Sequence, residues 1–152
     1  MKIFLTLIAL IASQSALGTP SILVIDKKFK KEEPVLSELI KDAHTEIQHT
    51  QKNKESIRYA ILQGMLSTKD YKWAYEEEGE NFILARMDYK GNILIVRIEY
   101  SYTLVQLKFH LGTKGFKCKY LTEEGICHNN RKKYYAYIKH LRNSIARIIT
   151  NM

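Results

Sequence analysis

The sequence predicts an α+β two-layer sandwich, in which an N-terminal and a C-terminal helix pack on one face of an antiparallel four-stranded meander. Three observations predict this fold class. Apolar and polar residues alternate through the middle of the chain at the period of a strand. Short turns, most of them containing glycine, separate these alternating runs. Before and after them, apolar residues recur at the spacing of an amphipathic helix.

Residues 1–18 are typical of a secretory signal peptide. Lys2 precedes an almost unbroken apolar run, and Ala16 and Gly18 place small residues at a cleavage site. The apolar run is shorter than the roughly 20 residues that a membrane-spanning helix needs. We therefore expect cleavage before Thr19 and a mature chain without a transmembrane segment. The alternatives are an uncleaved anchor and a buried N-terminal helix.

Residues 19–53 form a predicted leader region that contains one amphipathic helix. The short apolar run 21–25 is able to add an edge strand, and the charged run 26–33 predicts a loop. Pro34 suits the first position of a helix, and the apolar residues after it recur at helical spacing as far as the region of Gln51. This helix either packs on the domain or stays mobile.

Residues 54–152 form the predicted α+β domain, which opens with a second helix near Asn53 or Lys54. Gly64 lies within this helix and indicates a close contact with another element. A third helix closes the chain from about Asn130 to Thr150. Its apolar stripe consists of Tyr134, Ile138, Leu141, Ile145 and Ile148.

Five segments between these helices alternate as strands do, and the predicted meander takes four antiparallel strands from them. The segments are residues 71–77, 82–89, 93–100, 103–111 and 116–121. The predicted turns include the acidic run 76–81. On the strand 103–111, the covered face is expected to hold Val105, Leu107, Phe109 and Leu111. The opposite face mixes positive and negative charges, which favours cross-strand ion pairs in solvent. A ligand-binding sheet face is the alternative.

Positive charge is concentrated in the last third of the chain. The formal net charge is +8, and residues 105–152 hold 10 Lys and Arg against 2 Asp and Glu. This asymmetry can mark an anionic partner such as a membrane surface, an envelope polymer or a nucleic acid, although export argues against nucleic acid. The sequence favours the alternative, in which Lys and Arg only solvate the outer face of a strand and a helix, because no run of five or more basic residues occurs. The candidate anion-binding residues are Lys117, Lys119, Arg131, Lys132, Lys133, Lys139 and Arg142.

The two cysteines are Cys118 and Cys127, with eight residues between them. An even number of cysteines in an exported chain predicts a disulfide, and free structural thiols are the alternative. Two thiolates do not complete the four-ligand shell of a zinc site. A nucleophile formed by Cys127 and His128 is disfavoured, because adjacent side chains point apart.

No catalytic constellation is recognisable in the sequence. The five histidines lack metal-binding spacing, glycine-rich phosphate loops are absent, and the carboxylates of residues 76–80 fit a solvated turn. We therefore expect no enzyme, no metal and no cofactor. Tyr134, Tyr135 and Tyr137 lie beside basic residues, a pattern that can hold a single-stranded nucleic acid or a sugar polymer. Because Tyr134 belongs to the apolar stripe and Tyr137 borders it, only Tyr135 is expected to be free.

Four short runs are followed by a tyrosine-rich helix segment. They are residues 56–62, 71–73, 82–85 and 96–100, and the helix segment is 134–141. In this order the chain resembles a family of small exported proteobacterial proteins, mostly lipoproteins, of unknown function. Tyr137 stands where that family has a tryptophan. The resemblance implies a periplasmic address and an α+β fold. The lipid-carrying cysteine is missing here, so membrane anchoring does not carry over.

Together these patterns predict a periplasmic or extracellular protein that acts as a small, non-catalytic binding or structural module of the cell envelope. Its expected partner is another protein or an anionic envelope component. The alternatives are a secreted effector that acts on a host partner, and a protein that binds an anionic envelope component through its basic C-terminal third. The sequence leaves the oligomeric state open.

Overall fold

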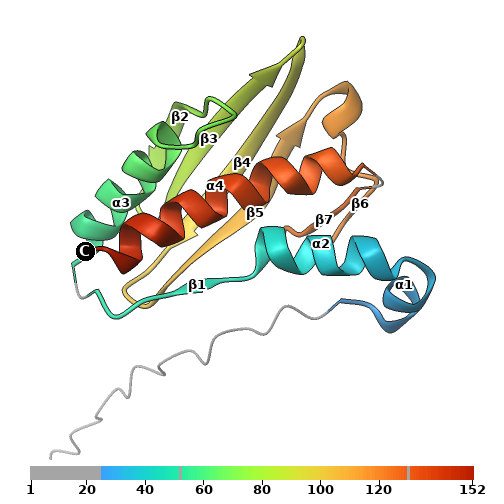
Figure 1. The fold of residues 1–152 in the computed structure, drawn as a ribbon, viewed down its shortest axis with the longest axis horizontal. Coiled ribbons are helices and arrows are strands. Elements are labelled where there is room, and N and C mark those ends of the chain that lie inside the picture. The colour runs from blue at the N-terminus through green and yellow to red at the C-terminus, as the bar shows by residue number, and fades with distance from the viewer. Residues whose placement is uncertain (1–24, 52, 130) are drawn as a thin grey trace, which may run out of the picture.

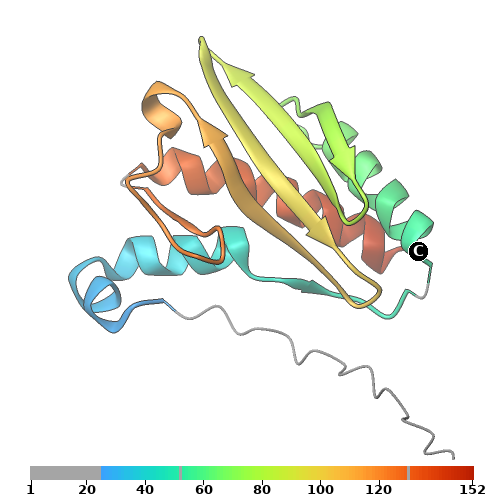
Figure 2. The same ribbon diagram turned by 180° about the vertical axis from the view of Figure 1, so that it is seen from behind.

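The computed structural model describes residues 25–51, 53–129 and 131–152. Three helices, α2 (Pro34–His44), α3 (Lys54–Leu66) and α4 (Lys132–Thr150), cover one face of an antiparallel sheet in Figure 1. Seen from behind in Figure 2, the other face of the sheet carries no α-helix from the part of the chain that the structure describes. The α+β class is therefore confirmed. The predicted signal peptide and residues 21–24 of the predicted edge strand lie outside the described residues.

The sheet has five strands rather than the predicted four, in the order β1-β5-β4-β3-β2. Their bounds are β1 Ile47–Gln48, β2 Ala74–Gly79, β3 Phe82–Tyr89, β4 Asn92–Tyr100 and β5 Leu104–Gly112. The additional strand is β1, in which Ile47 pairs with Val105 on the edge of β5. The leader helix was expected to continue to Gln51. It ends earlier because the chain extends here to pair with this edge.

The prediction of a sheet strand over residues 116–121 is wrong. The chain folds back after β5, and a side chain at Gly112 would collide with the carbonyl group of Phe116. A single 3₁₀ turn, η1 (Lys114–Phe116), follows. The strand β6 (Tyr120–Leu121) then pairs with β7 (Cys127–His128) in a separate hairpin.

The charged run 26–33 is not a loop, because it contains the short helix α1 (Lys27–Glu32). The cause is a local N-cap. The Oδ1 atom of Asp26 accepts hydrogen bonds from the backbone N–H groups of Lys28 at 2.8 Å and Phe29 at 3.1 Å.

Two irregularities alter the predicted strands. The acidic run 76–81 is mostly the end of β2, and only its last two residues turn. In β5, Phe109 pairs with Val96 whereas Leu111 pairs with Ile95, so the register shifts across His110. One extra residue in β5 turns the side chains after it to the opposite face of the sheet. Leu111 is therefore 43% exposed rather than covered.

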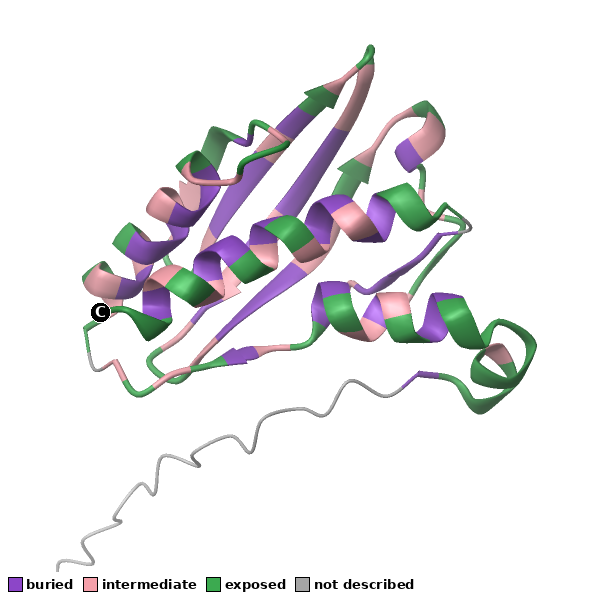
Figure 3. Cartoon of the chain, viewed as in Figure 1, coloured by how far each residue is buried: buried purple, intermediate pink, exposed green. Residues whose placement is uncertain are grey.

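One hydrophobic core joins the leader helix, the other helices and the sheet, as the buried residues in Figure 3 show. Ile40 and Ala43 of α2 lie in this core together with Ile57 of α3, so the leader helix packs on the domain. The predicted close contact at Gly64 is confirmed, since a Cβ atom there would lie 2.8 Å from the Cα atom of Ile145 on α4.

Candidate anion-binding site at the start of the last helix

Six exposed cations surround the start of α4, and we call this surface the basic end. Three of them come from η1 and the chain after it, and three come from the residues that open α4. They are Lys114, Lys117, Lys119, Arg131, Lys132 and Lys133. Five of the seven predicted anion-binding residues therefore belong to one region of the structure.

The side chain of Asn129 joins the two segments of the basic end. Its Nδ2 atom donates a hydrogen bond to the carbonyl oxygen of Lys117 at 2.9 Å, and its Oδ1 atom accepts one from the backbone N–H of Arg131 at 2.8 Å. Asn129 is buried. The predicted disulfide between Cys118 and Cys127 is also present, with their Cα atoms 5.6 Å apart. The disulfide and the hydrogen bonds of Asn129 thus hold the chain that follows η1 against the chain that leads into α4.

Tyr135 is buried rather than free, which corrects the expectation for this residue. Its hydroxyl group accepts a hydrogen bond from the backbone N–H of Asn129 at 2.6 Å and lies 2.9 Å from the carbonyl oxygen of the same residue. Burial raises the pKa of Tyr135 to about 12, although the hydrogen bond to Asn129 acts in the opposite sense. The hydroxyl therefore stays neutral and serves as a structural anchor.

The first turn of α4 carries positive charge where a helix normally prefers negative charge. Arg131 is the N-cap residue and makes no side-chain cap, and Lys132 and Lys133 follow in a first turn without an acidic residue. Because the helix dipole places about half a positive charge at this end, the three cations add to an already positive potential. Such an end attracts anions.

None of the six cations of the basic end forms an ion pair with another described residue. The other two predicted residues differ. Lys139 forms an ion pair with Asp42 at 2.8 Å. Arg142 donates hydrogen bonds to the carbonyl oxygens of Thr45 at 2.6 Å and Glu46 at 3.3 Å, and burial lowers its pKa. Lys139 and Arg142 therefore tie α4 to the leader.

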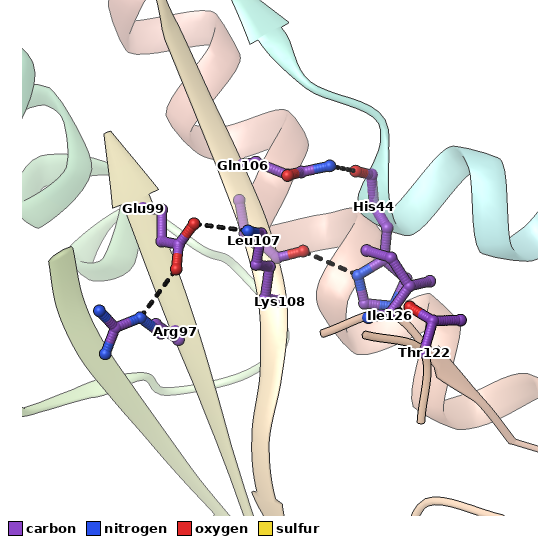
Figure 4. A network of polar contacts seen from close by, with 8 residues as sticks. All are labelled: His44, Arg97, Glu99, Gln106, Leu107, Lys108, Thr122 and Ile126. Carbon is purple, nitrogen blue, oxygen red and sulfur yellow. Dashed lines mark hydrogen bonds and ion pairs between the residues drawn. The ribbon is translucent and has the colours of Figure 1, made fainter. Parts of the chain in front are cut away.

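The charges on the open face of the sheet neutralise one another, as the predicted cross-strand ion pairs require (Figure 4). Glu99 contacts Arg97 at 2.9 Å and Lys108 at 2.6 Å. Partial burial acts to raise the pKa of Glu99, but hydrogen bonds from Lys108 and Arg97 hold it below its ordinary value. Arg86 of β3 pairs across the strands with Glu76 of β2 at 3.6 Å and along its own strand with Asp88 at 2.9 Å. The basic end therefore differs from the open face of the sheet, where opposite charges meet.

His44 is a buried polar residue that the sequence analysis did not single out. Its Nδ1 atom donates to the carbonyl oxygen of Leu107 at 2.8 Å, and its own carbonyl accepts from Nε2 of Gln106 at 3.1 Å (Figure 4). Burial lowers its pKa to about 4, against the opposing effect of the bond to Leu107. His44 therefore joins α2 to β5 as a neutral group. Its only sequence signal is its place four residues after Ile40 on the apolar stripe.

Within the described ranges, no group of three or more His, Cys, Asp or Glu side chains is placed to hold a metal ion. Among those same residues, no helix combines the length and the apolar character that crossing a membrane requires.

Comparisons with known proteins return no relative. No protein-family model, curated protein or solved structure matches this chain. The resemblance to exported proteobacterial proteins therefore stays a prediction from the sequence, and the geometry of the basic end carries the functional argument.

Proposed function

We propose that this protein is an exported, non-catalytic binding module of the cell envelope that holds an anionic partner on its basic end. One observation carries the proposal. Six exposed cations lie around a helix N-terminus without an ion-pair partner among the described residues, whereas the cations of the open sheet face are neutralised. Unpaired positive charge at this position destabilises the free protein, so a role in binding accounts for it.

The proposed partner is an anionic polymer of the cell envelope with repeated phosphate or carboxylate groups. The cations come from two chain segments and spread over an exposed surface, which suits several weak contacts along a chain. The signal-like residues 1–18 and the disulfide support export. Because solvent-exposed charges carry the attraction, the affinity is expected to fall steeply with salt.

The test uses the mature chain with polyphosphate and polygalacturonate as model polyanions and neutral dextran as the reference. The variant Lys119→Gln/Lys132→Gln removes two charges from the basic end. The matched control Lys69→Gln/Lys72→Gln removes two exposed charges elsewhere. We expect the first variant to bind polyanions about tenfold more weakly at low salt and the control to bind within about twofold of the wild type.

Two outcomes would reject the proposal. Equal losses in both variants would mean that net charge alone attracts polyanions. Equal affinity of the wild type for dextran and for the polyanions would show that charge plays no part in the binding.

A further inference from the structure

A cavity of about 150 Å³ lies beside the basic end, between the β3–β4 hairpin, η1 and the start of α4. Its lining consists of Tyr89, Asn92, Gly115, Phe116, Arg131, Lys133 and Tyr137. A cavity of this volume is large enough for one benzene-sized ring.

Aromatic side chains form the apolar walls of the cavity and hold one another in place. The ring centroid of Tyr137 lies 5.6 Å from that of Phe116 and 5.7 Å from that of Tyr89. Behind the wall, Tyr71 packs edge-on against Tyr137 at 4.2 Å. Phe116 and Tyr137 are buried. Because these rings are already ordered, a flat apolar ligand would lose little binding energy to rearrangement of its site.

The side chain of Asn92 fixes the position of η1 against the hairpin. Its Oδ1 atom accepts a hydrogen bond from the backbone N–H of Gly115 at 3.3 Å, and its Nδ2 atom lies 3.2 Å from the carbonyl oxygen of Tyr89. The polar groups of this side chain are thus engaged within the protein. The aromatic walls and the two cations are therefore the parts of the lining that we consider for ligand recognition.

Two cations of the basic end, Arg131 and Lys133, also line this cavity. The guanidinium group of Arg131 lies against Gly115, where a Cβ atom would be only 2.7 Å from Nη1, so the glycine leaves room for it. Neither side chain forms an ion pair or a hydrogen bond with another described residue. Their charges remain available beside an apolar cavity.

We propose that this cavity binds a small organic anion in which one apolar ring carries a single carboxylate or phosphate, such as an aryl carboxylate or an aryl phosphate. The rings of the walls take the apolar part, and Arg131 and Lys133 take the charge. This inference rests on the proposed function, because it uses two cations of the same basic end. It goes further by naming a ligand class that a charged surface alone does not select.

The probes are phenyl phosphate and benzoate. Inorganic phosphate, which has the anion without the ring, and benzyl alcohol, which has the ring without the anion, are the controls. Binding to the mature, oxidised chain is followed by amide chemical shifts in NMR titrations. We expect saturable shifts at residues 115–116 and 131–133 with the ring-bearing anions. Inorganic phosphate and benzyl alcohol are expected to bind at least about tenfold more weakly, since each lacks one part of the recognition.

Two exposed neighbours on α4 give a matched pair of variants. Lys133 lines the cavity and Lys132 does not. Lys133→Gln should weaken phenyl phosphate binding about tenfold, whereas Lys132→Gln should change it less than about twofold. Binding of polyphosphate should fall by similar amounts in both variants, because both cations belong to the basic end.

The outcomes separate the two proposals. Polyphosphate binding without saturable phenyl phosphate binding would reject the cavity as a ligand site and leave the proposed function standing. Saturable phenyl phosphate binding without polyphosphate binding would support the cavity and reject the polymer partner. Equal losses of phenyl phosphate binding in the two lysine variants would also overturn the cavity.

Discussion

The hydroxyl group of Tyr135 accepts a hydrogen bond from the backbone N–H of Asn129 at 2.6 Å. This contact fixes the chain immediately before α4, and the side chain of the same asparagine joins Lys117 to Arg131. A buried phenol therefore supports the arrangement of exposed cations several residues away. The basic end depends on a polar anchor inside the core as much as on the charges that form its surface.

Replacing Tyr135 with phenylalanine should destabilise the protein by about 1–3 kcal/mol. The substitution keeps the buried ring but leaves the backbone N–H of Asn129 without its acceptor in a water-excluded place. Urea unfolding would measure the loss. Tyr120→Phe is the control, because Tyr120 is 62% exposed. Equal stability of the two variants would show that the hydroxyl of Tyr135 is not an anchor.

Reduction of the disulfide between Cys118 and Cys127 should lower the free energy of unfolding by about 2–3 kcal/mol, because the cross-link restricts the unfolded chain. The measurement is the urea midpoint with and without a thiol reductant. A Cys118→Ser/Cys127→Ser variant should show the lower midpoint in both conditions. An unchanged midpoint on reduction of the wild type would contradict the prediction.

Gly64→Ala should destabilise the packing of α3 on α4 by about 1–3 kcal/mol, although alanine is the better helix former. The added Cβ atom would lie 2.5 Å from Cγ1 and 2.8 Å from Cα of Ile145, and the backbone atom has little freedom to move. Thermal unfolding would report the change. Leu66→Ala, at a side chain that is 77% exposed, should shift stability by less than about 0.5 kcal/mol. A stabilised Gly64→Ala variant would mean that the two helices separate at little cost.

Acid should destabilise the fold through His44. Its pKa is lowered by burial from 6.5 to about 4, so the unfolded state binds more protons between these values. Stability is therefore complete above pH 6.5 and falls as the pH drops towards 4, by a total on the order of 3 kcal/mol. Burial lowers the pKa values of His49 and His128 as well, and these residues act in the same direction.

Urea midpoints between pH 7.5 and pH 4 would measure this dependence. The variant His44→Gln removes the titrating group and should show a shallower loss of stability with acid than the wild type. A wild type and a variant with the same pH dependence would show that other groups cause the acid sensitivity.

Patterns confined to a few neighbouring residues predicted much of the fold. The strand β3 has the bounds expected from alternation, and α3 begins at the expected position, where the side chain of Asn53 caps it. Alternation predicted the wrong side for Leu111, because the register shift across His110 is a property of pairing with β4. The strand β1 escaped prediction because its two residues are extended only by pairing with β5.

The sequence by itself determined the α+β class, the wet and covered faces of the sheet and the concentration of positive charge near the C-terminus, because periodicity and composition are local properties. The tertiary structure alone decided which of these cations are available. Arg142 meets the carbonyl of Thr45, 97 residues earlier in the chain, whereas Lys132 meets no acidic partner among the described residues. Their difference depends on which distant segments the fold brings beside α4, and no local pattern records that.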